Sequence, residues 1–600
     1  MKMSLKLIMG NQAMAMGAIH AGVQVVSGYP GTPSSEVLET ISSHAGESLY
    51  VEWSVNEKVA LEVAAGASYA GKRSLVTMKQ VGLNVASDPL MCLAYVGIKG
   101  GMVVLVADDP GPISSQTEQD TRHFGIYSKL PVFDPSSPEE AYEMMGDAFA
   151  YSEKYGTPVI MRPTTRVCHA YAPIKMKSEL YKNTLEGFKK DPKWVIFPKL
   201  SYEAHLNIEA RNPVIGDDFS GYRFNFIEGS GRKGVVSAGV SYAYTKEALS
   251  LLGAECRLLK IGTPHPFPEK LALEFLQSVD EVLVLEELDP VIEKELVYLC
   301  GIHHIHLDIK GKRTGNVKQA GENSCESIAQ VLSLYLDIPY EKPEVLANMP
   351  ALPVRPPVLC AGCPHRASFY AVKQAMKGRK AVFAGDIGCY TLGNAMPLDM
   401  VDTCLCMGAG VTITQGIHHA EPDTVNFAFI GDSTFFHSGI TGIINSVYNE
   451  TDMILVVLDN STTAMTGHQP HPGTGKTMMG NITDKISIPA ILEAVGVSDI
   501  QIVDPFNLDE AAKAVERAAS KKGTKSIIFK SPCIAIIKPA PLLKVDEDKC
   551  TGCRKCIREL GCPAIIKSGT KVQIDPSLCY GCTICAQICP FDAIGGDIND

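Results

Sequence analysis

The 600-residue sequence has no long hydrophobic run and no excess of basic residues. A membrane-spanning helix needs roughly 18 uninterrupted apolar residues. No stretch of the chain approaches this length, so we expect no membrane partner. Lys and Arg number 55 against 66 Asp and Glu, which gives a net charge of −11 and argues against a nucleic-acid partner. The first apolar run ends at Gly10, too soon for a signal peptide, and we expect a cytoplasmic protein.

Low-complexity segments are also absent, and 46% apolar with 20% charged residues is an ordinary globular composition. At about 150 residues per domain, the length suggests roughly four folding units. Short β-branched runs alternate with helical stretches, which predicts a multidomain α/β fold with parallel sheets. The predicted divisions are an α/β domain (1–175), a connector (176–233), a second α/β domain (234–340), a Pro-rich linker (341–357), a third α/β domain (358–540) and a Cys-rich tail (541–600).

Eight of the 19 cysteines fall between residues 550 and 589. They form two runs of three cysteines spaced by two residues, and a Cys-Pro pair follows each run. In two-cluster ferredoxins the three closely spaced thiolates bind one cluster and the Cys before Pro binds the other. The predicted ligand sets are Cys550, Cys553, Cys556 and Cys589 for a first 4Fe-4S cluster, and Cys579, Cys582, Cys585 and Cys562 for a second.

Zinc is the alternative occupant of this tail, because paired Cys-x-x-Cys elements also bind zinc. Two consecutive Cys-x-x-Cys-x-x-Cys runs, each followed by Cys-Pro, favour iron and sulfur. Five residues separate Cys556 from Cys562, instead of the three usual in such ferredoxins. The fourth ligand of the second cluster is therefore the less secure one.

Polar residues follow two apolar, strand-like runs of the third domain. Asp432 comes directly after the run 427–430 and Gly431, and Asn460 comes directly after the run 453–458 and Asp459, 28 residues after Asp432. Because parallel strands present their carboxyl ends at one edge of a sheet, these side chains should lie together. Carboxylate and amide oxygens suit Mg²⁺ bound to a diphosphate. An ordinary Gly-Asp turn is the alternative for Asp432 alone.

The Gly-Asp pattern followed by Asn resembles the fingerprint of thiamine-diphosphate enzymes. The resemblance implies that Asp432, Asn460 and the carbonyl of Thr462 bind Mg²⁺, and that the segment Met407-Gly408 bends the cofactor. Together with Gly431, these are the candidate cofactor-binding residues of the domain. Four further cysteines are similar in order and spacing to the ligands of the proximal 4Fe-4S cluster in 2-oxoacid:ferredoxin oxidoreductases, namely Cys360, Cys363, Cys389 and Cys533. Each of them alone also fits a buried apolar position.

The first domain resembles the pyrimidine-binding domain of the same oxidoreductases, through residues 10–17 and 29–35 and a Glu ahead of small residues. The resemblance implies that Glu57 activates the aminopyrimidine ring, that Thr32 contacts the 2-oxo acid, and that Arg122 binds the substrate carboxylate. There are structural alternatives for two of them. Glu57 would complete a helix-capping box with Ser54, and Thr32 would cap the helix that follows it.

In its domain order the whole chain resembles the large subunits of the indolepyruvate branch of this family, through the segments 359–366, 385–390 and 459–472. The resemblance implies CoA-dependent oxidative decarboxylation of an arylpyruvate with reduction of external ferredoxin. The implied cofactors are thiamine diphosphate, Mg²⁺, two 4Fe-4S clusters in the tail and a third, proximal cluster. The domain 234–340 resembles a transketolase C-terminal domain.

The resemblance also implies partners. The family's γ-type domain is absent from the sequence, so we expect a smaller subunit and a heterotetramer of two large and two small subunits. Two other functions stay open: oxidation of a different 2-oxo acid, such as pyruvate or a branched-chain one, and electron transfer without catalysis. His468 and His471 are candidates for the substrate pocket, with ordinary loop residues as the alternative.

Overall fold

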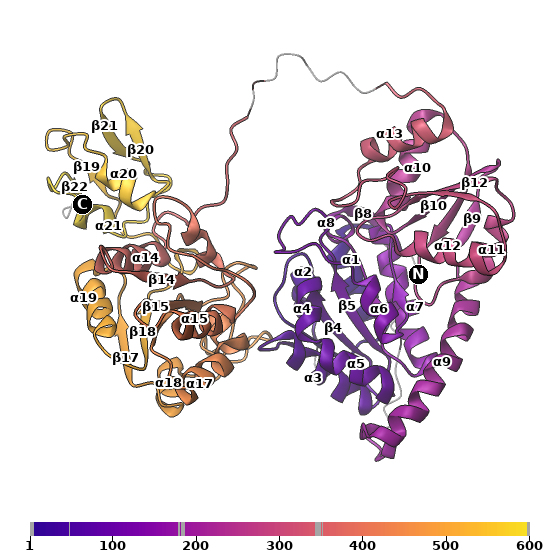
Figure 1. Cartoon of the computed structure of the whole chain (residues 1–600), viewed down its shortest axis with the longest axis horizontal. Coiled ribbons are helices and arrows are strands. Elements are labelled where there is room, and N and C mark those ends of the chain that lie inside the picture. The colour runs from indigo at the N-terminus through magenta and orange to yellow at the C-terminus, as the bar shows by residue number, and fades with distance from the viewer. Residues whose placement is uncertain are drawn as a thin grey trace. The chain divides into compact units, whose positions relative to one another are not determined.

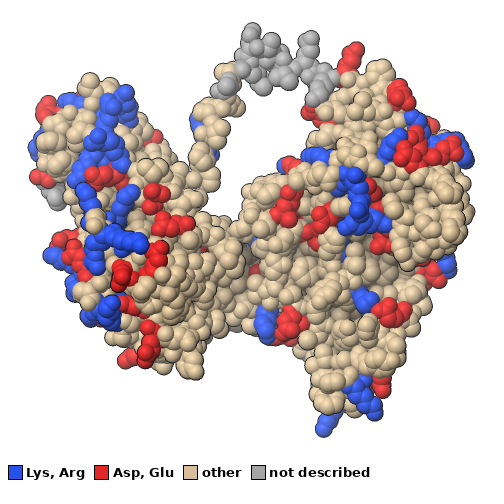
Figure 2. Space-filling model, viewed as in Figure 1, with Lys and Arg blue, Asp and Glu red and all other residues tan. Residues whose placement is uncertain are grey.

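The computed structural model describes residues 5–46, 49–177, 181, 187–341, 350 and 352–596. The chain divides into two compact units, Met1–Met349 and Pro350–Asp600. The predicted Pro-rich linker lies partly outside the described residues. No helix within the described ranges is long and apolar enough to cross a membrane. Figure 2 shows acidic and basic side chains interspersed on the visible face of each unit.

A six-stranded parallel sheet forms the first half of the N-terminal unit, with strand order β3-β2-β4-β5-β7-β6. Two of its inner strands, β2 and β5, are wholly buried, as expected in a sheet covered on both faces. The strands are β2 (Val25–Gly28), β3 (Tyr50–Trp53), β4 (Ser74–Lys79), β5 (Met102–Ala107), β6 (Val132–Phe133) and β7 (Val159–Met161). The helices are α1 (Gly10–His20), α2 (Ser35–Ser43), α3 (Glu57–Tyr69), α4 (Gln80–Val85), α5 (Ser87–Val96), α6 (Arg122–Ser128), α7 (Pro138–Tyr155) and α8 (Thr165–His169).

A five-stranded sheet in the order β13-β12-β10-β11-β9 forms the second half of this unit (Figure 1). Its strands are parallel except β9, which runs antiparallel to β11. The strands are β9 (Phe226–Glu228), β10 (Lys233–Ala238), β11 (Arg257–Ile261), β12 (Glu281–Leu285) and β13 (Asp308–Lys310), and the helices are α10 (Val240–Leu252), α11 (Glu269–Leu276), α12 (Val291–Ile302) and α13 (Cys325–Leu336).

The region between these two sheets contains a long helix, α9 (Pro198–Ser220), which contacts α5 of the first half and α11 of the second. The connector thus packs on both neighbours. A short 3-10 turn, Pro192–Trp194, precedes it. The chain's first strand, β1 (Leu5–Met9), pairs antiparallel with β8 (Tyr171–Lys175).

The C-terminal unit contains a five-stranded parallel sheet in the order β14-β15-β16-β18-β17. Its strands are β14 (Ala381–Ala384), β15 (Val425–Gly431), β16 (Met453–Asp459), β17 (Asp499–Val503) and β18 (Thr524–Lys530). Its helical segments are α14 (Pro364–Ala375), η2 (Cys389–Asn394), α15 (Ala409–Ala420), α16 (Asp432–Thr434), the π-turn η3 (Phe435–Gly439), α17 (Ile440–Tyr448), α18 (Ile488–Ala494), α19 (Leu508–Ala519) and η4 (Ile534–Ile536).

The Cys-rich tail folds as two small antiparallel ladders and two short helices (yellow in Figure 1). Its elements are β19 (Lys544–Val545), α20 (Lys555–Leu560), β20 (Ile565–Ser568), β21 (Lys571–Ile574), α21 (Ile584–Gln587) and β22 (Ile594–Gly595). Tail residues such as Leu560 and Ile584 belong to the same buried apolar cluster as Phe369 of α14 and Ala511 of α19. The tail is therefore held against the sheet domain by a shared core. The predicted α/β class, with parallel sheets and a small ferredoxin-like tail, is confirmed.

Candidate functional site

Asp432 and Asn460 lie at one edge of the C-terminal unit's sheet. Asp432 directly follows β15 and Asn460 directly follows β16, and these two strands are neighbours in parallel register, with Gly431 opposite Leu458. Both side chains are buried, 3% and 6% exposed. The Asp432 carboxylate accepts backbone N–H bonds from Ser433 (2.8 Å) and Ser461 (2.7 Å). These bonds fix the carboxylate at the strand end, where ligands of parallel sheets bind.

The oxygens at this edge fit Mg²⁺ and a diphosphate. Asp432 offers a carboxylate, Asn460 an amide oxygen, and Thr462, 5% exposed, a backbone carbonyl. The Thr462 backbone N–H donates to Asn460 Oδ1 (3.3 Å), so the two residues form one turn. A hard divalent cation with oxygen ligands matches this donor set.

Two histidines contact these candidate ligands. His471 Nε2 lies 3.1 Å from Asp432 Oδ2, and its side chain is 5% exposed. Asn460 Nδ2 donates to His365 Nε2 (3.3 Å). Burial lowers the pKa of His365 to about 4, so its ring is neutral and its Nε2 can accept this bond. Of the two candidate loop histidines, His471 therefore lies beside Asp432 at the strand edge. His468 is exposed to solvent.

His365 was missed by sequence reasoning. The signal available was its position directly after Cys363-Pro364, two residues from a candidate cluster ligand. The contact itself joins residues 95 positions apart, which no local pattern reveals.

The segment Met407-Gly408 is held beside the helical run that begins at Asp432. The Gly408 N–H donates to Asp386 Oδ2 (2.7 Å), and Ser438 Oγ donates to the Met407 carbonyl (2.8 Å). Gly408 has φ +84°, and a Cβ there would lie 2.4 Å from Ser438 Oγ, so only glycine fits. Burial raises the pKa of Asp386 to about 7.

The candidate proximal cysteines lie close to one another. Burial raises the pKa of Cys389 to about 11, and nearby Cys533 and Cys360 add to that shift. Cys363 is fully packed in the same region, and burial raises its pKa to about 12. Grouped thiols that resist ionisation become thiolates when a metal supplies positive charge. This chemistry fits an iron-sulfur cluster.

A backbone hydrogen bond joins one of the candidate proximal cysteines to the strand edge that carries Asp432 and Asn460. The Cys533 N–H donates to the Asn460 carbonyl (2.9 Å). Cys533 follows β18, the neighbour of β16, so both residues come from strand ends at the same edge.

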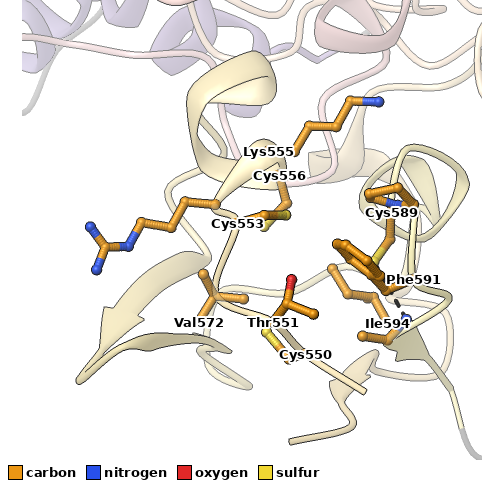
Figure 3. Close-up of a pocket in the computed structure, with 12 residues that line it drawn as sticks. Cys550, Thr551, Cys553, Lys555, Cys556, Val572, Cys589, Phe591 and Ile594 are labelled. Atoms are coloured by element: carbon orange, nitrogen blue, oxygen red, sulfur yellow. Dashed lines mark hydrogen bonds between the residues drawn. The ribbon is translucent and has the colours of Figure 1, made fainter. Parts of the chain in front are cut away.

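The tail brings its predicted ligand sets together. Figure 3 shows Cys550, Cys553, Cys556 and Cys589 around one pocket that Val572, Phe591 and Ile594 also line. In the second set, burial raises the pKa of Cys585 well above its usual range, and nearby Cys582, Cys562 and Cys579 add to the shift. Most residues between Cys556 and Cys562 lie in α20, and Gly561 caps this helix in a left-handed conformation. Cys562 thereby returns to the second set.

Glu57 is buried, 6% exposed, at the start of α3 in the N-terminal unit. The helix is capped by Asn56, whose side chain accepts the Val59 N–H (2.9 Å). Ser54 instead donates to Glu52, so the capping-box alternative is wrong. A Cβ on Gly82 of α4 would lie 2.6 Å from Glu57 Oε1, so the carboxylate packs against bare backbone.

Thr32 follows β2 in the six-stranded sheet of the N-terminal unit. Its carbonyl accepts from Ser114 Oγ (3.2 Å), and it precedes the cis-proline Pro33. Because α2 begins at Ser35, after Ser34, Thr32 does not cap that helix and this alternative is also wrong.

The guanidinium of Arg122 is buried and bonded to other parts of the protein. It is 1% exposed, and all three guanidinium nitrogens donate to protein oxygens. Its partners are Asp120 (2.6 Å), Glu286 of the second half (2.6 Å), and the carbonyls of Glu287 (2.7 Å) and Asp289 (2.9 Å). The prediction that Arg122 binds the substrate carboxylate is therefore wrong, because its donors are already used in a buried ion network.

Three family models match the chain. Residues 16–223 match the thiamine-diphosphate-binding domain of pyruvate flavodoxin/ferredoxin oxidoreductases, residues 386–529 match the C-terminal TPP-binding domain of thiamine pyrophosphate enzymes, and residues 542–590 match a 4Fe-4S dicluster domain. The chain therefore binds thiamine diphosphate and iron-sulfur clusters.

Relatives match along nearly the whole length. The chain is 43% identical to the indolepyruvate oxidoreductase subunit IorA of Methanothermobacter thermautotrophicus, over 98% of this chain and 96% of that one. It is 40% identical to the subunit IorA of Pyrococcus abyssi, over the same shares. The 2-oxoglutarate synthase subunit KorA of Archaeoglobus fulgidus is 26% identical, over 50% of this chain and 92% of its own. The chain belongs to the IorA family of indolepyruvate oxidoreductase subunits, within the thiamine-diphosphate-dependent 2-oxoacid:ferredoxin oxidoreductases.

Proposed function

We propose that this chain is the large subunit of an enzyme that oxidises arylpyruvates, namely indolepyruvate, phenylpyruvate and hydroxyphenylpyruvate. One arylpyruvate, one CoA and two oxidised ferredoxins give one aryl-acetyl-CoA, one CO₂, one proton and two reduced ferredoxins. The similarity to IorA proteins over 98% of the chain supports this substrate class, because the 2-oxoglutarate relative matches only half of it.

The observation that carries the proposal is the hydrogen bond from Cys533 to the Asn460 carbonyl, 2.9 Å long. It ties a candidate cluster ligand to a candidate magnesium ligand. Thiamine diphosphate, when bound, supplies the electron sink for loss of CO₂. The proposed ligands beside it would hold an iron-sulfur cluster, and such a cluster accepts electrons singly, as a ferredoxin acceptor requires.

The residues have the following proposed roles. Asp432, Asn460 and the Thr462 carbonyl hold Mg²⁺, and Met407 with Gly408 shapes the cofactor site. Glu57 holds a proton at its carboxylate, against the cofactor's aminopyrimidine nitrogen. Thr32 contacts the 2-oxo acid through its hydroxyl.

The cluster ligands are proposed as three sets, which are Cys360, Cys363, Cys389 and Cys533 for the proximal cluster, Cys562, Cys579, Cys582 and Cys585 for the second, and Cys550, Cys553, Cys556 and Cys589 for the first. A smaller γ-type subunit completes the enzyme, and we propose two copies of each subunit.

The test is a substrate comparison with the purified two-subunit complex. We expect kcat/KM for indolepyruvate and phenylpyruvate to exceed that for pyruvate and a branched-chain 2-oxo acid by at least about tenfold. That factor corresponds to about 1.4 kcal/mol of transition-state discrimination. Equal or higher turnover of pyruvate would contradict the assignment.

A second arm separates catalysis from simple electron transfer. Glu57→Gln should lower kcat about 100-fold or more, the usual contribution of a positioned acid or base, while the iron content stays unchanged. Asp432→Ala should abolish turnover. Full activity in the Asp432 variant would favour a non-catalytic electron-transfer subunit.

A further inference from the structure

Arg366 connects the first turn of α14 with the end of α20 in the tail. The side chain is 4% exposed. Its Nη1 donates to the carbonyl of Leu560 (2.5 Å), the last residue of α20, and its Nη2 donates to the carbonyl of Leu359. A weaker contact joins Nη2 to the Cys360 carbonyl at 3.5 Å. One guanidinium therefore spans the sheet domain and the Cys-rich tail.

The cysteines around Arg366 belong to two different ligand sets. Burial lowers the pKa of its guanidinium, and Cys562, Cys363, Cys582 and Cys360 oppose that shift. Cys360 and Cys363 are proximal ligands, whereas Cys562 and Cys582 are ligands of the second cluster. Two of the carbonyls that Arg366 contacts belong to Cys360 of the proximal set and to Leu560, two residues before Cys562 of the second set, so its charge lies close to both sets.

One donor of Arg366 remains unused. Its Nε is buried and has no hydrogen-bond partner among the described residues. A buried donor without an acceptor is unfavourable, so this N–H is expected to have a partner in the complete site. The sulfur atoms of a cluster bound by the neighbouring cysteines are acceptors that this N–H could use.

We propose that Arg366 links the proximal and second 4Fe-4S clusters electrostatically and favours the reduced state of both. The proposal rests on the proposed function for the assignment of the two ligand sets. Reduction adds one negative charge to a cluster, so a fixed positive charge close to it stabilises the reduced form. Net charge and hydrogen bonds to sulfur are two main determinants of cluster potential. Because Arg366 is buried, water screens its charge little.

The charge of Arg366 also affects the electrostatic repulsion between the two clusters. Two reduced clusters repel one another, and a cation between their ligands offsets that repulsion. Arginine suits this place better than lysine would, because it stays protonated when buried and its planar fork can donate in several directions at once.

The test is EPR-monitored potentiometric titration of the purified complex with Arg366→Lys, Arg366→Gln and Arg366→Met. We expect the reduced-to-oxidised ratio of both clusters, at one fixed potential, to fall about tenfold in the Gln and Met variants. For a one-electron couple this is a shift of about 59 mV. The Lys variant keeps the charge and should stay within about threefold of the wild type.

Arg517→Met is the matched control, because Arg517 is an exposed arginine of the same unit whose Nε donates to Gln501 (3.1 Å). It should leave all cluster potentials unchanged. Wild-type potentials in fully iron-loaded Gln and Met variants would overturn the proposal. Loss of iron in all three Arg366 variants would also overturn it, since the residue would then serve packing alone.

Iron counting separates this proposal from the proposed function. About eight irons in the wild-type chain would remove the proximal cluster and this inference with it. About twelve irons, together with unchanged potentials in the Met variant, would overturn the role of Arg366 alone.

Discussion

A single buried side chain orients one of the candidate metal ligands, Asn460. Asn460 would present either its oxygen or its nitrogen to a metal, since the two ends of an amide have the same shape. The neutral ring of His365 accepts from Nδ2 and so leaves Oδ1 facing the Thr462 turn. Partners of metal ligands are worth about 10–100-fold in affinity.

We therefore predict that His365→Phe weakens thiamine diphosphate binding about tenfold in the presence of Mg²⁺, because the Asn460 amide is then free to rotate. Titration of the purified complex with the cofactor, followed by tryptophan fluorescence or calorimetry, measures this. His468→Phe is the control, since His468 is exposed, and it should bind normally. Equal affinities in both variants would show that His365 does not orient Asn460.

For Arg122 we predict an effect on the stability of the fold and not on cofactor binding. Arg122→Leu should lower the free energy of unfolding by about 3–5 kcal/mol, because it removes the guanidinium that pairs with the buried carboxylates of both Asp120 and Glu286. Chemical denaturation of the full chain, followed by circular dichroism, gives this value. Arg166→Leu should cost less than about 1 kcal/mol, since its ion pair with Glu322 is half exposed. A stable Arg122 variant with only a raised KM would restore the substrate role.

These residues show what the sequence could predict. Cysteine spacing is local, so the tail's ligand sets followed from positions two residues apart. Asp432 and Asn460 followed from strand ends, because neighbouring parallel strands share an edge. The Arg122 prediction failed because its partner Glu286 lies 164 positions away in another sheet. Contacts of that range depend on how domains pack, which motif spacing does not encode.

At the scale of elements, the loop before α15 depends on one glycine. Gly408→Ala should destabilise the loop by about 1–3 kcal/mol, since the new Cβ meets Ser438 Oγ and φ +84° is unfavourable for alanine. We expect weaker thiamine diphosphate binding and faster proteolysis of the loop in the cofactor-free complex.

Gly416 is the matched control within α15 itself. A Cβ at Gly416 meets nothing within 4 Å, so Gly416→Ala should be neutral or stabilise the helix by up to about 1 kcal/mol. If both alanine variants behaved alike, the left-handed conformation at Gly408 would not matter for the site.

At the scale of the whole molecule, cofactor stoichiometry tests the assembly. We predict about twelve irons per chain in the anaerobically purified complex, and about eight in Cys533→Ser, provided each cluster has four irons. Iron and thiamine analysis by mass spectrometry measures both. Cys168→Ser is the control, because Cys168 is buried in the N-terminal unit and belongs to no proposed ligand set. An unchanged iron content in Cys533→Ser would exclude the proximal cluster.

The opening turn of α14 serves three different groups within four residues. Cys363 is a proposed ligand of the proximal cluster, His365 contacts Asn460, and Arg366 donates to the Leu560 carbonyl. One residue inserted into this turn would rotate the later side chains by about 100° relative to the earlier ones. Defects there should consequently appear together: a preparation that loses its vitamin cofactor through damage to this turn would also show altered colour and magnetism of its iron.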